Sequence, residues 1–132
     1  MAGYRTARLD DIAAEQWPYW APVRHHFGIE TFGVNAWRGK EGDRVITPHD
    51  HSEDATPELY VVISGAATFT IGGEEHEASA VEFVWVEDAN AERVAYATAD
   101  DTVVLSIGAG SHGADTAYTP SGWDTHYLEG GE

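Results

Sequence analysis

The sequence predicts an all-β domain, a sandwich or closed barrel of short strands with a short N-terminal arm. From Gly28 onward, short runs of aromatic and β-branched residues are each ended by Gly, Pro, Asp or Asn. No helical period follows residue 20, and such regularly spaced short strands are typical of sandwiches and barrels. The expected strands cover residues 29–37, 44–51, 58–64, 66–71, 74–78, 81–86, 93–97 and 102–107.

The N-terminal segment is expected to be an arm that lies on the barrel. Asp10 to Glu15 can form a short helical turn, because aspartates suit the positive end of a helix. The aromatic stretch that begins at Trp17 cannot be regular helix, because Pro18 and Pro22 interrupt it. We expect its aromatic side chains to pack in the core or in a dimer interface.

The whole chain of 132 residues is expected to form one domain. Its boundaries are predicted as an arm over 1–28, a barrel core over about 29–108 and a tail over 109–132 that wraps back onto the barrel. Within the core, Gly72-Gly73 predicts a tight hairpin turn, because two glycines supply positive φ angles.

Charge and composition exclude several functions. The formal net charge of −16 at pH 7 makes binding to nucleic acid or to an anionic membrane unfavourable. The absence of cysteine excludes disulfides and thiolate metal sites. The N-terminus lacks the uninterrupted apolar stretch of a signal peptide or a membrane span, so we expect a cytoplasmic protein.

His49 and His51 are the first candidate functional residues. On a strand, side chains two positions apart point to the same face, so the two imidazoles project together while Asp50 points away. Two imidazoles beside a carboxylate are a suitable seat for Fe, Mn, Ni, Zn or Cu.

The segment from Gly42 to Gly65 resembles the first conserved motif of the cupin superfamily. That motif is a Gly, five residues, His-x-His, three or four residues, a Glu, six residues and a Gly. Here Glu58 and Gly65 keep the last gap, whereas the gap from His51 to Glu58 is longer and predicts an enlarged loop at the barrel mouth. The resemblance covers about residues 29–108 and implies a double-stranded β-helix, or jelly-roll, barrel.

The second cupin motif is a Gly, five residues, Pro-x-Gly, two residues, a His, three residues and an Asn. Placed on this chain without a gap, it puts Glu92 at the metal-binding His and Tyr96 at the Asn, and every signature residue has changed. The resemblance therefore implies a divalent metal ion held by His49, His51, Glu58 and Glu92. Glu92 is also the candidate catalytic proton acceptor, with Glu58 as the alternative.

Two functions remain open at this stage. The first is a metal-dependent cupin enzyme, of dioxygenase or isomerase type, that binds a small molecule in the barrel cavity. The alternative is a metal-free ligand-binding or accessory module without catalytic activity. A homodimer is expected under both, because small cupins usually pair barrels and the aromatic arm is hard to bury alone.

Other polar and aromatic side chains are assigned to the surface, to the cavity wall or to substrate binding. His76, on the return strand of the hairpin, is expected in a solvated position. The remaining candidates are aromatic residues for the cavity wall and cations for an anionic substrate: Tyr60, Trp85 and Tyr96, and Arg38, Arg44 and Arg93.

Overall fold

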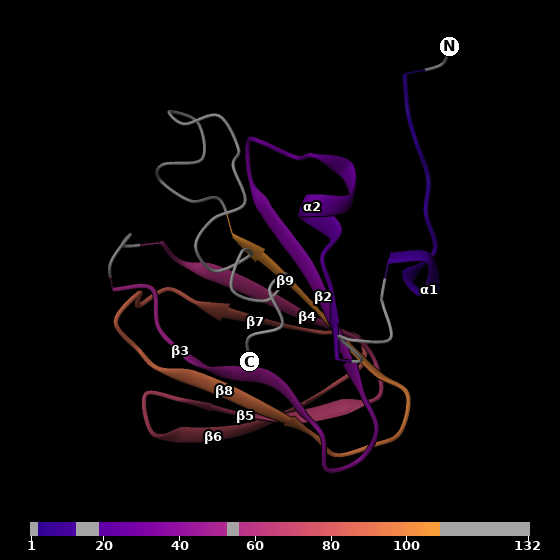
Figure 1. The fold of residues 1–132 in the computed structure, drawn as a ribbon. Coiled ribbons are helices and arrows are strands. Elements are labelled where there is room, and N and C mark those ends of the chain that lie inside the picture. Colours follow the sequence, from indigo (N-terminus) through magenta and orange to yellow (C-terminus); the bar gives the residue numbers. More distant parts are fainter. Residues whose placement is uncertain (1–2, 13–18, 53–55, 109–132) are drawn as a thin grey trace.

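The computed structural model describes residues 3–12, 19–52 and 56–108, which form two facing β-sheets with little helix (Figure 1). The helices are α1 (Leu9–Ile12) and α2 (Val23–Phe27). The strands are β1 (Trp20–Ala21), β2 (Gly33–Gly39), β3 (Arg44–His49), β4 (Glu58–Ser64), β5 (Ala66–Ile71), β6 (Glu74–Ser79), β7 (Glu82–Val86), β8 (Arg93–Ala97) and β9 (Thr102–Gly108).

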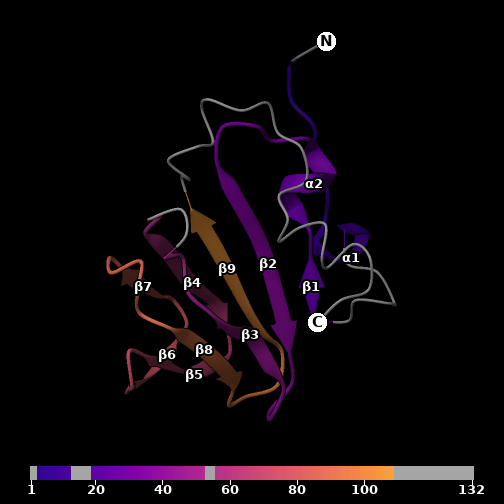
Figure 2. The same cartoon turned by 60° about the vertical axis from the view of Figure 1, so that its left-hand side comes forward.

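Both sheets are antiparallel and exchange strands along the chain. One sheet has the order β1-β2-β9-β4-β7 and the other β3-β8-β5-β6 (Figures 1 and 2). This is the predicted double-stranded β-helix barrel, and each expected strand is present. The differences lie at ends: β2 begins at Gly33, not at residue 29, and β3 ends at His49, two residues early.

Side chains alternate between the barrel interior and its exterior, as the pleat of a strand requires. Tyr60 and Val62 of β4, Phe69 of β5 and Val104 of β9 all point inward and are fully buried. The rings of Tyr60 and Phe69 join the two sheets, with centroids 5.5 Å apart. Because the interior is filled in this way, polar side chains at the mouth are where a ligand can reach the barrel.

Glycines make two of the turns between strands. Gly72 and Gly73 have φ angles of 56° and 88°, which confirms the predicted hairpin between β5 and β6. Gly65 joins β4 to β5 at φ 73°, and a Cβ there would overlap the side chain of Thr102. The glycine that ends the first motif is therefore required both by its backbone angle and by close packing.

The arm is more regular than the sequence predicts. Trp20 and Ala21 add a short strand to the sheet edge opposite Trp37 and Ala36, and Trp20 packs on Trp37 at a centroid distance of 6.2 Å. The helix α2 directly after Pro22 was not expected. The turn at Asp10 is present as α1, while residues 13–18 and the predicted tail 109–132 lie outside the described residues.

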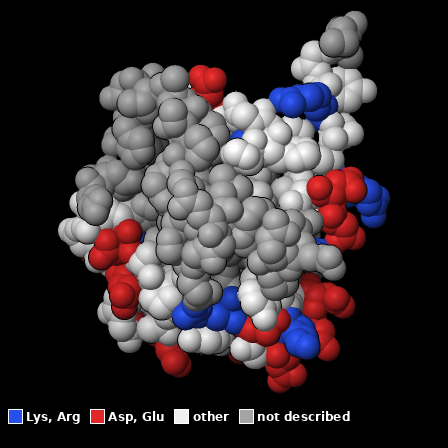
Figure 3. All heavy atoms as spheres, viewed as in Figure 1, with Lys and Arg blue, Asp and Glu red and all other residues white. Residues whose placement is uncertain are grey.

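Acidic side chains are spread over the visible surface and do not gather in one place (Figure 3). Such a distribution is that of a solvated surface. In the described part of the chain, no helix is long and apolar enough to cross a membrane.

Candidate metal site

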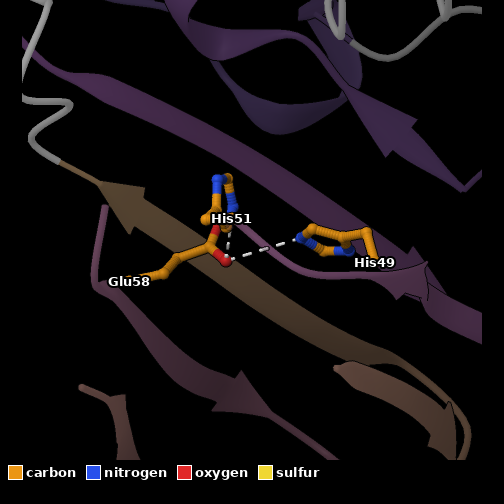
Figure 4. Close-up of side chains that lie close together, drawn as sticks. All are labelled: His49, His51 and Glu58. Carbon is orange, nitrogen blue, oxygen red and sulfur yellow. Dashed lines mark ion pairs between the residues drawn. The ribbon is translucent and has the colours of Figure 1, made fainter. Parts of the chain in front are cut away.

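Two histidines and one glutamate meet at the barrel mouth (Figure 4). His49 ends β3, His51 follows it by two residues, and Glu58 begins β4 in the opposite sheet. Each offers one ligand atom, and these atoms lie within 4.8 Å of one another. The structure thus brings together three of the four residues that the sequence suggests as metal ligands.

The three side chains converge on a single oxygen atom. Oε1 of Glu58 lies 3.2 Å from Nε2 of His51 and 3.6 Å from Nε2 of His49. The two imidazole rings stand edge to face, with centroids 5.1 Å apart. All three side chains are mostly buried, so interactions within this cluster are less screened by water than interactions at the surface.

A backbone carbonyl fixes which nitrogen of His49 carries a proton. Nδ1 of His49 lies 2.7 Å from the carbonyl oxygen of Thr47, which can only accept a hydrogen bond, so Nδ1–H is the donor. In the neutral ring, Nε2 then presents a lone pair toward the carboxylate of Glu58. With a neutral ring, these two facing acceptors are stabilised by a cation between them, either a metal ion or a proton.

Glu92 lies outside this cluster. It is exposed and is not among the residues whose ligand atoms approach one another. Its neighbour Arg93 pairs with His49 in the register of β3 and β8, and Arg93 therefore points to the inside of the barrel. The position that the sequence assigns to a fourth ligand is thus taken by a guanidinium one residue further along the chain.

Arg93 is fully buried, and each of its guanidinium nitrogens donates a hydrogen bond. Nη1 donates to Oε1 of Glu58 at 3.1 Å, and Nε and Nη2 donate to the carbonyl oxygen of Ala91. Nη2 also reaches the carbonyl oxygen of Asp88. Arg93 therefore joins the loop between β7 and β8 to Glu58, and this geometry overturns its expected role in holding an anionic substrate.

Tyr60 completes the surroundings of the carboxylate. Its hydroxyl donates to Oε1 of Glu58 at 2.6 Å. Burial and the neighbouring carboxylate raise the pKa of Tyr60 well above its ordinary value, so the phenol keeps its proton. Burial alone would raise the pKa of Glu58, but the neighbouring imidazoles of His49 and His51 and the hydrogen bond from Tyr60 outweigh it and hold that pKa below its ordinary value.

Several other expected site residues lie elsewhere. Trp85 and Tyr96 point outward and are about half exposed, so they do not form the cavity wall. Arg38 makes an ion pair with Asp10 on the outside of the barrel, at 2.6 Å. His76 is exposed, as expected, and pairs with Glu82.

One surface hollow, of about 540 Å³, lies between the N-terminal segment and α2. Its lining residues, Tyr4, Arg5, Thr6, His26 and Phe27, include none of the cluster. The chemistry of the described residues therefore centres on the mouth cluster.

The donor set fits a divalent transition metal ion. Two imidazoles and one carboxylate form the set that many iron sites use, with coordination positions left open. The bond from His49 to Thr47 is the kind of outer contact that orients a metal-binding imidazole.

Comparison with known proteins supports the fold. No family model matches the sequence, and a search of curated proteins finds no match. Among solved structures, a cupin protein from Bacteroides fragilis is similar at a TM-score of 0.63 and 22% identity, over 92% of this chain and 96% of that one. A cupin-superfamily sugar phosphate isomerase from Silicibacter pomeroyi has a TM-score of 0.58 at 20% identity, over 70% of this chain and 59% of that one.

A third neighbour, a putative sugar phosphate isomerase from Acidithiobacillus ferrooxidans, has a TM-score of 0.57 at 21% identity. The match covers 67% of this chain and 56% of that one. Together these structures define the class: a small barrel with the cupin fold. The resemblance that the first motif indicates is thus confirmed at the level of the fold.

Proposed function

We propose that this chain holds a divalent transition metal ion, of Fe, Mn, Ni, Zn or Cu, on His49, His51 and Glu58 and binds a small molecule beside it. The single observation that carries the proposal is the convergence of His49, His51 and Glu58, whose ligand atoms lie within 4.8 Å of one another. A cation placed there is contacted by all three ligand atoms. Because Glu92 is exposed, the proposal leaves it out of the ligand set.

The metal ion supplies a Lewis acid or an oxygen-binding centre. Each residue around it has a separate task. Thr47 orients His49, while Tyr60 and Arg93 hold the carboxylate of Glu58 in place.

Oxygenation and isomerisation are the reactions that we propose to screen first. Two of the structural neighbours are named as sugar phosphate isomerases, which makes sugar phosphates a first set of compounds for the isomerisation arm. Since Arg93 is committed to Glu58 and to loop carbonyls, it is not available to pair with a phosphate group.

A metal-free binding module is the second candidate, and Arg93 favours it. Its guanidinium already balances the charge of Glu58, so a proton on an imidazole can satisfy the cluster without a metal ion. The barrel would then bind a ligand, or act as an accessory domain, without turnover.

Elemental analysis of protein purified without chelator separates the two candidates. The wild type is compared with His51→Ala and with His76→Ala, which removes an exposed imidazole outside the cluster. We expect about one equivalent of metal in the wild type and in His76→Ala, and little in His51→Ala. If the wild type holds no metal even after reconstitution with each ion, the metal proposal is wrong and the binding-module candidate stands.

A further inference from the structure

The surface hollow beside α2 is lined by two separate parts of the chain. Its volume is about 540 Å³, and its lining residues are Tyr4, Arg5, Thr6, His26 and Phe27. The N-terminal segment supplies the first three and α2 the last two, and the two segments run side by side in both views of the fold (Figures 1 and 2). The lining thus combines rings, a guanidinium and a hydroxyl, and it contains no carboxylate.

Contacts at two places hold the N-terminal segment beside the barrel. Nη2 of Arg5 donates a hydrogen bond to the carbonyl oxygen of Phe27 at 2.7 Å, and the guanidinium lies 5.5 Å from the centre of the Phe27 ring. Further along the same segment, Asp10 forms an ion pair with Arg38 of β2. Because the segment is attached at both places, the hollow exists before a ligand arrives, and a preformed site lowers the ordering cost of binding.

The rings of the lining offer apolar contact surface. The ring of His26 stands edge to face on that of Phe27, with centroids 4.9 Å apart. Gly28 ends α2 directly after them with a φ angle of 67°, so both rings belong to the final turn of the helix. Tyr4 is 75% exposed, and most of its ring is therefore open to contact. Aromatic rings of this kind pack well against another ring.

The hollow is a basic place on an acidic protein. The chain has 23 acidic residues against 7 lysines and arginines, yet α2 contains no acidic residue and its last turn carries Arg24, His25 and His26. Asp10, in the N-terminal segment, is engaged by Arg38. An anion in the hollow therefore meets the guanidinium of Arg5 without a competing carboxylate in the lining.

Arg5 keeps donors for such an anion. Its hydrogen bond to Phe27 uses one guanidinium nitrogen, and its side chain makes no other hydrogen bond or ion pair with the residues that the structure describes. A guanidinium pairs with the oxygen atoms of carboxylate and phosphate groups through parallel N–H groups. Because Arg5 is exposed, water screens this pairing, and a ligand also needs contact with the rings.

We propose that the hollow beside α2 binds a small aromatic anion, a ring that carries a carboxylate or a phosphate group. The anionic group pairs with Arg5, and the ring of the ligand lies against Tyr4 and His26. This inference concerns a second binding place. It does not rest on the proposed metal site, and it gives the hollow no catalytic role.

Size and charge favour a small anion over other ligands. The volume of about 540 Å³ falls within the range of roughly 300–1,000 Å³ that is usual for small-molecule sites. The net charge of −16 would repel a polyanion such as nucleic acid. A metal ion would find a single imidazole and no carboxylate in the lining, which is a poor ligand set.

Titration of the isotope-labelled full chain with benzoate, followed by amide NMR shifts at constant ionic strength, tests the proposal. We expect saturating shifts at residues 4–6 and 24–28, with a dissociation constant on the order of 1 mM because the ligand is small. Arg5→Gln is expected to weaken binding at least about 10-fold. The matched control, Arg8→Gln, removes the same charge from the same segment outside the hollow and is expected to weaken binding less than about 2-fold.

Three further probes separate the parts of the ligand. Benzamide keeps the ring without the charge, and acetate keeps the charge without the ring, so each is expected to bind at least about 10-fold more weakly than benzoate. Phenyl phosphate distinguishes the two anionic groups, because tighter binding than that of benzoate assigns the hollow to phosphates and weaker binding assigns it to carboxylates. Binding of benzamide or acetate as tight as that of benzoate would overturn the proposal.

A second variant guards against the possibility that Arg5→Gln only releases the N-terminal segment. His26→Ala alters the hollow from α2 and keeps the hydrogen bond of Arg5, which ends on a backbone carbonyl. It is expected to weaken binding at least about 3-fold, and the amide spectrum of each variant reports whether the native fold is kept.

Four results in folded protein would overturn the proposal. These are the absence of saturating shifts with both benzoate and phenyl phosphate, binding that Arg5→Gln and His26→Ala leave unchanged, equal losses in Arg5→Gln and Arg8→Gln, and shifts that centre on His49 and His51 instead of the hollow.

Discussion

The two sheets of this barrel differ most on the faces that look away from each other. On the five-stranded sheet, the outward residues of β4, β7 and β9 are apolar. On the four-stranded sheet, the outward positions are largely polar and include Thr68, Thr70, Glu75 and Glu77. One sheet is thus suited to water and the other to a covering surface.

The inner faces of the two sheets also differ, because they carry side chains that bond to each other across the barrel. The five-stranded sheet contributes the carboxylate of Glu58 and the phenol of Tyr60, while the four-stranded sheet contributes the cation Arg93 and the imidazole of His49. Opposite charges on the inner faces hold the two sheets together, whereas the outer face of the five-stranded sheet is apolar. Substitutions on the inner and outer faces can test these two features separately.

Two phenylalanines make the sharpest comparison. Phe69, on the four-stranded sheet, is fully buried against Tyr60, whereas Phe83, on the five-stranded sheet, is 65% exposed. We expect Phe69→Ala to lower the free energy of unfolding by about 3–5 kcal/mol at any protein concentration. Phe83→Ala is expected to change the stability of the single chain by less than about 0.5 kcal/mol.

Urea unfolding of the wild type and of each variant measures both effects. If Phe83→Ala instead destabilised the chain as strongly as Phe69→Ala, Phe83 would be a core residue rather than a surface residue.

Two arginines allow a buried ion pair to be compared with an exposed one. Arg93 bonds Glu58 between the sheets, while Arg38 bonds Asp10 outside the barrel, with Asp10 80% exposed. We expect Arg93→Met to cost about 3 kcal/mol of unfolding free energy, because it leaves a mostly buried carboxylate without its guanidinium. Arg38→Met is expected to cost less than about 1 kcal/mol.

The double variant Glu58→Gln/Arg93→Met tests the cause of that loss. If the cost arises from the charge left on Glu58, removing this charge restores part of the stability. Equal losses of stability in Arg93→Met and in the double variant would instead assign the cost to the lost hydrogen bonds between Arg93 and the loop that joins β7 to β8.

The smallest expected effect concerns the exposed pair that links β6 to β7. The hydrogen bond from His76, followed by that from the backbone of Ser79, lowers the pKa of Glu82 below its ordinary value of 4.5. A lowered carboxyl pKa stabilises the fold above about pH 4.5, and the stabilisation is lost as the pH falls through the folded-state pKa. Thermal unfolding of the wild type and of Glu82→Gln should therefore differ slightly at about pH 6 and converge at about pH 3. A difference that grew on acidification would contradict this assignment.

Much of the fold could be predicted from the sequence because its signals are local. Alternating apolar residues and turn glycines such as Gly65 and Gly72 mark the strands, and these are the strands that form. The short helix α2 escaped prediction because Pro22 and its aromatic neighbours indicate irregular structure, whereas Trp20 and Ala21 form β1 and the helix starts directly after Pro22. Outward Trp85 and Tyr96 were misplaced because an aromatic residue fits either face of a strand.

In the candidate site, three residues could be predicted from local sequence spacing and a fourth could not. His49, His51 and Glu58 could be predicted from spacing, and their ligand atoms do approach one another. Arg93 could not, because its direction depends on the register between β3 and β8, which shifts twice along their pairing. A shift of one residue turns each side chain of a strand to the other face, and here that separates Glu92 from Arg93.

The guanidinium of Arg93 also sets the electrical balance of the mouth. The charges of one carboxylate and one guanidinium cancel, and imidazoles that bind a metal ion are neutral, so these four side chains present no net charge to an arriving ion. A divalent cation bound there keeps both of its positive charges uncompensated in a mostly buried place, which is costly unless a counterion enters with it. If a divalent ion binds here, it would therefore enter together with an anionic ligand, and occupancy by the ion would depend on that ligand as much as on the protein.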